Sequence, residues 1–188
     1  MDHLPEIIQE LIKKSNEAKN NAFCPYSNFR VGAALLTDDG KIIQGCNVEN
    51  ASYTLGICAE RCAIFKAVSE GYRHFKALAI STDVEQLYST PCGACRQIMY
   101  EFGSDMDVYM TRPDLTYMKK TPRDILIHPF GPEELRMLKV GKIPDMDGDI
   151  SGGPNGDLND NKMGEMVDGS GDTPPLKKLK EDTAIPTQ

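Results

Sequence analysis

The chain has 188 residues and a net charge of −7, with 28 acidic and 21 basic side chains. This acidic balance argues against binding driven by the phosphate backbone of a nucleic acid, and without a long apolar run we expect no membrane contact. No signal peptide is expected at the start of the chain, so its six cysteines are predicted to be reduced thiols rather than a disulfide framework.

The first elements along the chain are a helix and a hairpin. Apolar residues recur at helical spacing near the start, which predicts a helix over Leu4–Asn20. Next comes an apolar strand, Phe29–Leu36. The turn signal Asp38-Asp39-Gly40 then leads into a second strand, Lys41–Asn47.

The middle of the chain alternates between helices and strands. A stretch without helix breakers that is followed by Gly71 predicts a helix over Cys58–Glu70. Pro91 before a second stretch and Gly103 after it predict a helix over Cys92–Phe102. Short buried strands are expected after them, at Ala77–Ser81 and Asp107–Met110. This order indicates a mixed sheet with helices on both faces. Because the two helices bracket one strand, right-handed crossovers place them on the same face.

Two shorter helices, Arg123–Ile127 and Pro132–Lys139, complete a predicted globular domain over residues 1–143. Residues 144–188 contain 10 acidic and 4 basic side chains, 7 glycines and 5 prolines. Such a segment lacks the apolar density to offset the entropy lost on folding, so we predict a disordered tail. Within it, Lys177–Lys180 resembles a short nuclear import signal, and the alternative is a solvated tail.

Three cysteines have the spacing of a catalytic zinc site. Cys58 lies upstream of the pair Cys92 and Cys95, and Glu60 follows Cys58 by two residues. Three thiolates hold the metal and leave the fourth position to water, so Glu60 is free to move protons. All three thiols fall at the N-terminal ends of predicted helices, where the helix dipole and free N–H groups favour thiolates.

Other interpretations of these cysteines stay open at this stage. Cys62, one helical turn after Cys58, would allow a structural site with four cysteines. Cys92 and Cys95 would also suit a redox pair, or the thiols are simply buried. Neither a structural nor a redox site gives Glu60 a task. Arg61 is expected either to bond a ligand sulfur, offsetting the excess charge of three thiolates, or to be an exposed helix arginine.

Six stretches together resemble the small homotetrameric cytidine deaminases. They are Cys24–Ser27, Val31–Ala34, Gly45–Ala51, Cys58–Glu60, Pro91–Gln97 and Phe130–Leu135. The resemblance implies a three-layer α/β/α fold with a five-stranded mixed sheet. It also implies zinc-dependent hydrolysis of cytidine and deoxycytidine to uridine and deoxyuridine, in pyrimidine salvage. We expect a cytoplasmic protein, and also a nuclear one if Lys177–Lys180 acts as an import signal. Cys58, where polynucleotide deaminases usually carry histidine, points toward free nucleosides.

The resemblance also assigns contacts to the sugar. Asn47 and Glu49 match a ribose-binding pair, and residues two apart in an extended segment point to the same side. Without the motif, both would pass for a polar turn at a strand end. Tyr53 is similar to a residue that approaches the 5′ side of the sugar. Ser52, Thr54 and Arg30 depart from the residues that relatives often show near the sugar.

Contacts to the base follow from the same resemblance. Phe29 resembles an aromatic residue that packs near the base, although it would also suit a strand core. The backbone N–H of Ala59 is the expected donor to the base O2. Phe130 matches an aromatic residue that reaches into the site of a neighbouring subunit, whereas in a monomer it would cap the last helix. Small residues at Ala59, Cys62 and Ala63 are expected to let helices of neighbouring chains approach closely.

The mechanism implied by these parts uses one carboxylate twice. Zinc lowers the pKa of its bound water, and Glu60 takes the water proton and passes it to N3 of the base. After attack at C4, Glu60 returns a proton to the amino group, which leaves as ammonia. Two other classes of function stay open: a zinc aminohydrolase acting on another base, such as blasticidin S, a guanine-like compound or RNA, and an inert zinc-binding interaction protein.

Overall fold

The computed structural model describes Met1, residues 3–132 and Leu135. The elements described here belong to the first of two compact units, Met1–Lys139. The predicted domain boundary at 143/144, the predicted tail and most of the predicted helix Pro132–Lys139 lie outside the described residues. No helix among the described residues has the length and apolar character needed to cross a bilayer.

Five strands form one mixed sheet in the order β2-β1-β3-β4-β5. They are β1 (Val31–Thr37), β2 (Ile42–Cys46), β3 (Phe75–Thr82), β4 (Asp107–Thr111) and β5 (Tyr117–Lys120). β1 is antiparallel to both β2 and β3, β3 is parallel to β4, and β4 is antiparallel to β5. The predicted mixed α/β sheet is therefore confirmed, and Gly40, with φ of 90°, turns the predicted β1–β2 hairpin.

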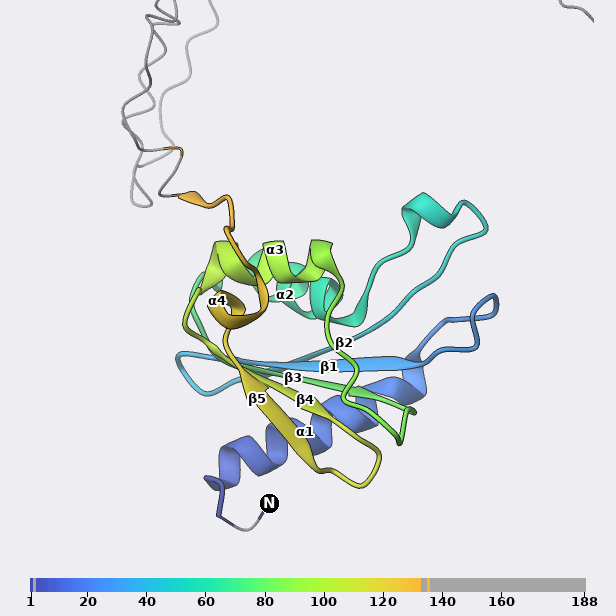
Figure 1. Cartoon of the computed structure of the whole chain (residues 1–188), viewed down its shortest axis with the longest axis horizontal. Helices are drawn as coiled ribbons and strands as arrows, with labels where there is room; N and C mark the ends of the chain where they lie inside the picture. The colour runs from blue at the N-terminus through green and yellow to red at the C-terminus, as the bar shows by residue number, and fades with distance from the viewer. Residues whose placement is uncertain (2, 133–134, 136–188) are drawn as a thin grey trace, which may run out of the picture. The chain divides into compact units, whose positions relative to one another are not determined.

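Helices cover both faces of the sheet (Figure 1). α1 (Glu6–Ala18) lies on one face, while α2 (Ala59–Ser69), α3 (Gly93–Phe102) and the short α4 (Pro122–Ile125) lie on the other. Alternate β1 residues supply the two cores: Ala33 and Leu35 pack on the α2 side, and Ala34 and Leu36 on the α1 side. The two site helices share one face, as their right-handed crossovers require.

Gly45 on β2 fixes how closely α2 approaches the sheet. A Cβ atom at this position would lie 2.5 Å from the backbone nitrogen of Ala63 and 2.6 Å from the carbonyl oxygen of Ala59. Ala59 and Ala63 are both fully buried. The expectation that these alanines form a contact between chains is therefore wrong, because β2 of the same chain already covers them.

Element ends differ from the sequence prediction by a few residues. α1 begins after Pro5, and a 3₁₀ turn, Lys19–Asn21, follows its end. α4 begins at Pro122 instead of Arg123, because Thr121 forms a capping box with Asp124, and it ends at Ile125. The residue pattern gave no signal for β5, which is a short edge strand with two lysines.

Candidate functional site

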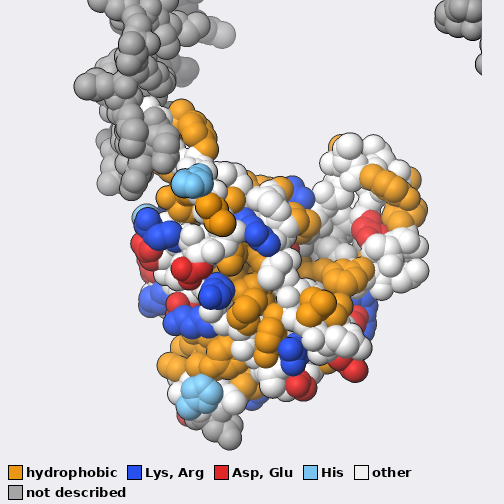
Figure 2. Space-filling view, viewed as in Figure 1, with side chains coloured by type: hydrophobic (Ala, Val, Ile, Leu, Met, Phe, Trp, Pro, Cys, Tyr) orange, Lys and Arg blue, Asp and Glu red, His pale blue; other side chains and the backbone are white. Residues whose placement is uncertain are grey.

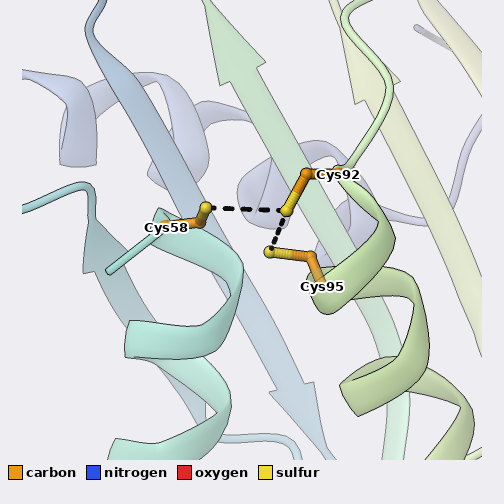
Figure 3. Close-up of side chains that lie close together, drawn as sticks. All are labelled: Cys58, Cys92 and Cys95. Carbon is orange, nitrogen blue, oxygen red and sulfur yellow. Dashed lines mark hydrogen bonds between the residues drawn. The ribbon is translucent and has the colours of Figure 1, made fainter. Parts of the chain in front are cut away.

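Three sulfur atoms meet where α2 and α3 begin. Cys58 is the residue before α2, Cys92 is the residue before α3, and Cys95 lies in the first turn of α3. Their side chains point toward one another (Figure 3), with Sγ–Sγ distances of 3.8 Å for Cys58–Cys92 and 3.5 Å for Cys92–Cys95. Zn–S bonds near 2.3 Å in a tetrahedron require sulfurs about 3.8 Å apart. The three thiols therefore fit a zinc ion.

The cysteines meet because both helices start at the same end of the sheet. Cys62 N–H donates to the Cys58 carbonyl and Arg96 N–H to the Cys92 carbonyl, so each cysteine occupies the cap position of its helix. The other N–H groups of each first turn have no partner within their helix, and they place a positive potential beside the thiols.

Electrostatics favour an ionised sulfur at Cys58. The pKa of Cys58 falls to about 5, because the Cys95 thiol and the Arg61 guanidinium donate to its sulfur. The pKa of Cys95 is raised, because this thiol donates to Cys58 and is buried. Arg61 Nη2 lies 3.7 Å from the Cys58 Sγ atom, so Arg61 makes the sulfur contact considered from sequence, and its own pKa is raised.

Glu60 lies beside this cluster and is only 4% exposed. Burial, and secondarily the negative charge of Cys58, raise the pKa of its carboxyl group to about 7. A group that titrates near neutrality can both accept and return a proton. Glu60 therefore has the position and the proton affinity needed for a proton shuttle.

A cavity of about 590 Å³ opens over the cluster. Its lining brings together predicted residues from distant parts of the sequence: Phe29, Asn47, Glu49, Tyr53, Cys58, Glu60, Arg61 and Cys92. The loop that carries Tyr53 projects from the domain (Figure 1), and Figure 2 shows a hollow between this loop and the domain body.

Asn47 and Glu49 each organise a loop beside the cavity. Asn47 accepts a hydrogen bond from Val31 N–H and donates one to the Phe29 carbonyl, both at 2.9 Å. Glu49 accepts from the N–H groups of Tyr26 and Ser27 at 3.0 and 3.2 Å, and from the Ser27 hydroxyl. The Ser27 hydroxyl lowers the pKa of Glu49, which keeps the side chain an acceptor.

The other predicted contacts occupy different places. Tyr53 is 80% exposed and its ring lies 5.9 Å from that of Tyr26. Ala59 is buried as the first residue of α2. Phe130 does not line the cavity; its ring is largely exposed, and its carbonyl accepts a hydrogen bond from Gln97 at 2.6 Å.

The remaining cysteines lie apart from the metal cluster. Among the described residues, only Cys58, Cys92 and Cys95 bring their sulfurs close enough together to share an ion. Cys62 is half-buried, and Cys46 donates its thiol to the Asn21 carbonyl at 3.2 Å. The structure therefore gives no support to a four-cysteine site with Cys62.

Sequence reasoning missed three hydroxyl residues in the cavity wall: Thr82, Ser89 and Thr90. The hydroxyl groups of Thr82 and Ser89 are hydrogen-bonded at 2.9 Å. The available signal was position, since Thr82 ends β3 and Ser89 and Thr90 stand just before Pro91-Cys92.

Comparison with known proteins identifies the family of this site. Residues 5–111 match the family model described as "Cytidine and deoxycytidylate deaminase zinc-binding region". The chain is 48% identical over 130 residues to a probable cytidine deaminase of Dictyostelium discoideum. The aligned region covers 69% of this chain and 88% of that relative. It is also 48% identical over 129 residues to cytidine deaminase of Sporosarcina psychrophila. That aligned region covers 68% of this chain and 94% of the relative.

Solved structures agree with the sequence matches. Cytidine deaminase from Burkholderia pseudomallei superposes with a TM-score of 0.64 at 43% identity, covering 68% of this chain and all of that one. Cytidine deaminase from Mycobacterium tuberculosis superposes with a TM-score of 0.57 at 37% identity, covering 66% of this chain and 97% of that one.

Proposed function

This chain belongs to the cytidine and deoxycytidylate deaminase family, and on that premise we propose roles for its residues in a hydrolytic deamination. The enzyme is a zinc-dependent cytidine deaminase that releases uridine and ammonia. We propose that deoxycytidine is a second substrate and that the reaction serves pyrimidine salvage in the cytoplasm. The observation that carries the assignment is the buried Glu60 beside three convergent thiols, of which Cys58 and Cys92 line the same cavity as Glu60.

Cys58, Cys92 and Cys95 are the residues that hold the metal. When bound, zinc supplies a water molecule with a pKa near neutrality. Glu60 removes a proton from the attacking water and delivers it to N3 of the base, and the C4–O bond forms. Glu60 then takes the remaining proton of the new C4 hydroxyl and delivers it to the amino group, so that the C4 carbonyl forms as the C4–N bond breaks and ammonia leaves. The proton affinity of Glu60, raised by burial, suits both transfers.

The cavity wall supplies the contacts that orient the substrate. We assign the sugar 3′-hydroxyl to Asn47 and Glu49: after their loop contacts, the Asn47 amide keeps one free N–H and Glu49 keeps about one of its four lone-pair sites. Tyr53 approaches the 5′ side, the ring of Phe29 packs on the base, and the N–H of Ala59 donates to O2. A site built on such polar contacts rejects analogues that lack the hydroxyl.

We further propose that the working enzyme is a homotetramer. Large apolar side chains are strongly exposed on the described surface, notably Tyr53 (80%), Leu55 (70%), Ile127 (81%) and Phe130 (61%). We assign these side chains to surfaces that another subunit covers. Phe130 of one subunit then closes the base pocket of the next, which explains why it lies outside its own cavity.

A substrate panel tests the assignment. Purified protein is assayed for ammonia release from cytidine, deoxycytidine, guanine and blasticidin S. Turnover of the two cytosine nucleosides at rates well above the other compounds is expected. Activity on another base alone would contradict the proposal, and no release from any compound by zinc-loaded protein would favour an inert zinc-binding role.

A further inference from the structure

The guanidinium group of Arg96 donates three hydrogen bonds, each to a different residue. Arg96 follows Cys95 on α3. Its Nε donates to the Pro91 carbonyl at 2.7 Å, Nη2 to the Thr90 hydroxyl at 3.1 Å and Nη1 to the Ile125 carbonyl at 2.9 Å. All three acceptors are neutral oxygens, so the guanidinium holds backbone and hydroxyl groups in these contacts and not a carboxylate.

Two of these bonds fix the segment just before Cys92. Thr90 and Cys92 both line the cavity, and Pro91 lies between them. Proline has no N–H group, so the carbonyl is the one backbone group that Pro91 itself can use in a hydrogen bond, and Arg96 donates to it. A shift of this peptide would move a wall of the cavity and a zinc ligand together.

The third bond holds the segment that leads to Phe130. Ile125 ends α4, and five residues later the Phe130 carbonyl accepts a hydrogen bond from Gln97, the neighbour of Arg96. Two adjacent residues of the zinc helix therefore tie down both ends of residues 125–130. An arginine suits this position because its rigid fork reaches three acceptors at fixed angles, which a lysine ammonium cannot do.

We propose that Arg96 is a positioning residue for the deamination. It holds Thr90 and Pro91 in the cavity wall and the segment that leads to Phe130 against the same turn of α3. The position of Phe130 relative to Cys92 is thereby fixed. The part that concerns Phe130 rests on the proposed cover of a neighbouring site. The part that concerns Thr90 and Pro91 depends on this chain alone.

The main test compares Arg96→Lys with Arg123→Lys in the full-length, zinc-loaded enzyme. Arg123 is a matched control: it ties α4 to the loop after α3 through Asp105 at 3.2 Å and Ser104 at 3.0 Å, and none of these residues lines the cavity. We expect Arg96→Lys to lower kcat/KM by about tenfold or more, since small displacements at a site are costly, and Arg123→Lys to leave it unchanged.

A second readout is independent of turnover. Cobalt(II) replaces zinc in both variants, and the thiolate-to-cobalt absorption bands report the geometry at Cys92. A shifted spectrum is expected for Arg96→Lys and the wild-type spectrum for Arg123→Lys. Wild-type kinetics together with a wild-type spectrum in folded Arg96→Lys would overturn the proposal.

Two further variants separate the parts. Gln97→Met removes the donor to the Phe130 carbonyl without adding a charge, so we expect a raised KM for cytidine with an unchanged cobalt spectrum. An unchanged KM in this variant, together with a shifted spectrum in Arg96→Lys, would contradict the role of Arg96 toward Phe130. It would still support the role of Arg96 in positioning Thr90 and Pro91. If Arg96→Lys does not fold, Thr90→Val removes the hydroxyl that accepts from Arg96 and should raise KM for cytidine by about two- to fivefold. An unchanged KM in Thr90→Val would contradict the role of Arg96 in positioning Thr90 and Pro91.

Discussion

The two faces of the sheet bury polar groups in different ways. On the α1 face, the hydroxyls of Ser15, Ser81 and Thr111 form a buried chain with contacts of 2.7 and 2.5 Å, and its ends donate to the carbonyls of Ile12 and Ile80. Every member of this chain has a partner, as buried polar groups in a stable core require. This face serves stability.

The opposite face keeps polar groups that are not fully satisfied. Glu60 is buried with a raised pKa, Cys58 favours a thiolate, and Nε of Arg61 is buried without an acceptor among the described residues. Such groups cost stability unless a ligand or a reaction uses them. The difference teaches that function lies on the face where the fold leaves polar groups incompletely paired. Substitutions on the α1 face should therefore change the free energy of unfolding, and substitutions on the opposite face should change metal binding and turnover.

The largest effect should come from removing a ligand. Cys95→Ala leaves two thiols for the ion, too few to fill the three protein positions of a catalytic site. We expect loss of zinc and loss of measurable deamination. Elemental analysis and an ammonia assay check this. Full activity in a variant that holds no zinc would place the chemistry elsewhere.

Glu60→Gln should separate proton transfer from metal binding. The amide preserves the shape of the side chain but cannot accept or return a proton, so kcat should fall by about 10²–10⁴-fold. Zinc content should stay at one per chain. Thermal stability should not decrease, because the substitution removes an ionisable group that is 4% exposed. Near-wild-type turnover would show that another group moves the proton.

Leu11→Ala should act on stability and leave the chemistry intact. Leu11 is fully buried in the α1-side core, and truncation of a buried leucine costs about 2–5 kcal/mol of unfolding free energy. Denaturant titration measures this loss, while kcat of the folded enzyme at low temperature should match the wild type. A parallel fall in kcat would show that the two faces are not independent.

Phe130→Ala probes the edge of the functional face. If Phe130 covers the base of a neighbouring site as proposed, its removal costs about 1 kcal/mol, which corresponds to roughly a fivefold rise in KM for cytidine. Specific activity should also fall on dilution in step with loss of the proposed tetramer. Sedimentation that shows a fully active monomer would return Phe130 to the role of a local cap.

Sequence reasoning anticipated the two faces unequally. The thiols, Glu60 and the order of elements were predictable because helix breakers, ligand spacing and alternation are local signals. The wall formed by Thr82, Ser89 and Thr90, and the contacts of Arg96, were not predictable, because they depend on where β3 ends relative to α3. β5 escaped prediction for a related reason: two lysines on a short edge strand leave too little apolar alternation.

The smallest effect is expected for Cys62→Ala, which tests how sharply the functional face is bounded. Cys62 lies on α2, one turn after Cys58. Among the described residues, however, only the sulfurs of Cys58, Cys92 and Cys95 lie close enough together to share an ion. Zinc content should stay at one per chain, and kcat/KM should change by less than about twofold, because a half-buried thiol that binds nothing resembles a small apolar side chain. Cys46→Ala is the matched control, since that thiol bonds the Asn21 carbonyl away from the ion. Loss of zinc in Cys62→Ala but not in Cys46→Ala would extend the metal centre by one helical turn and favour a structural site.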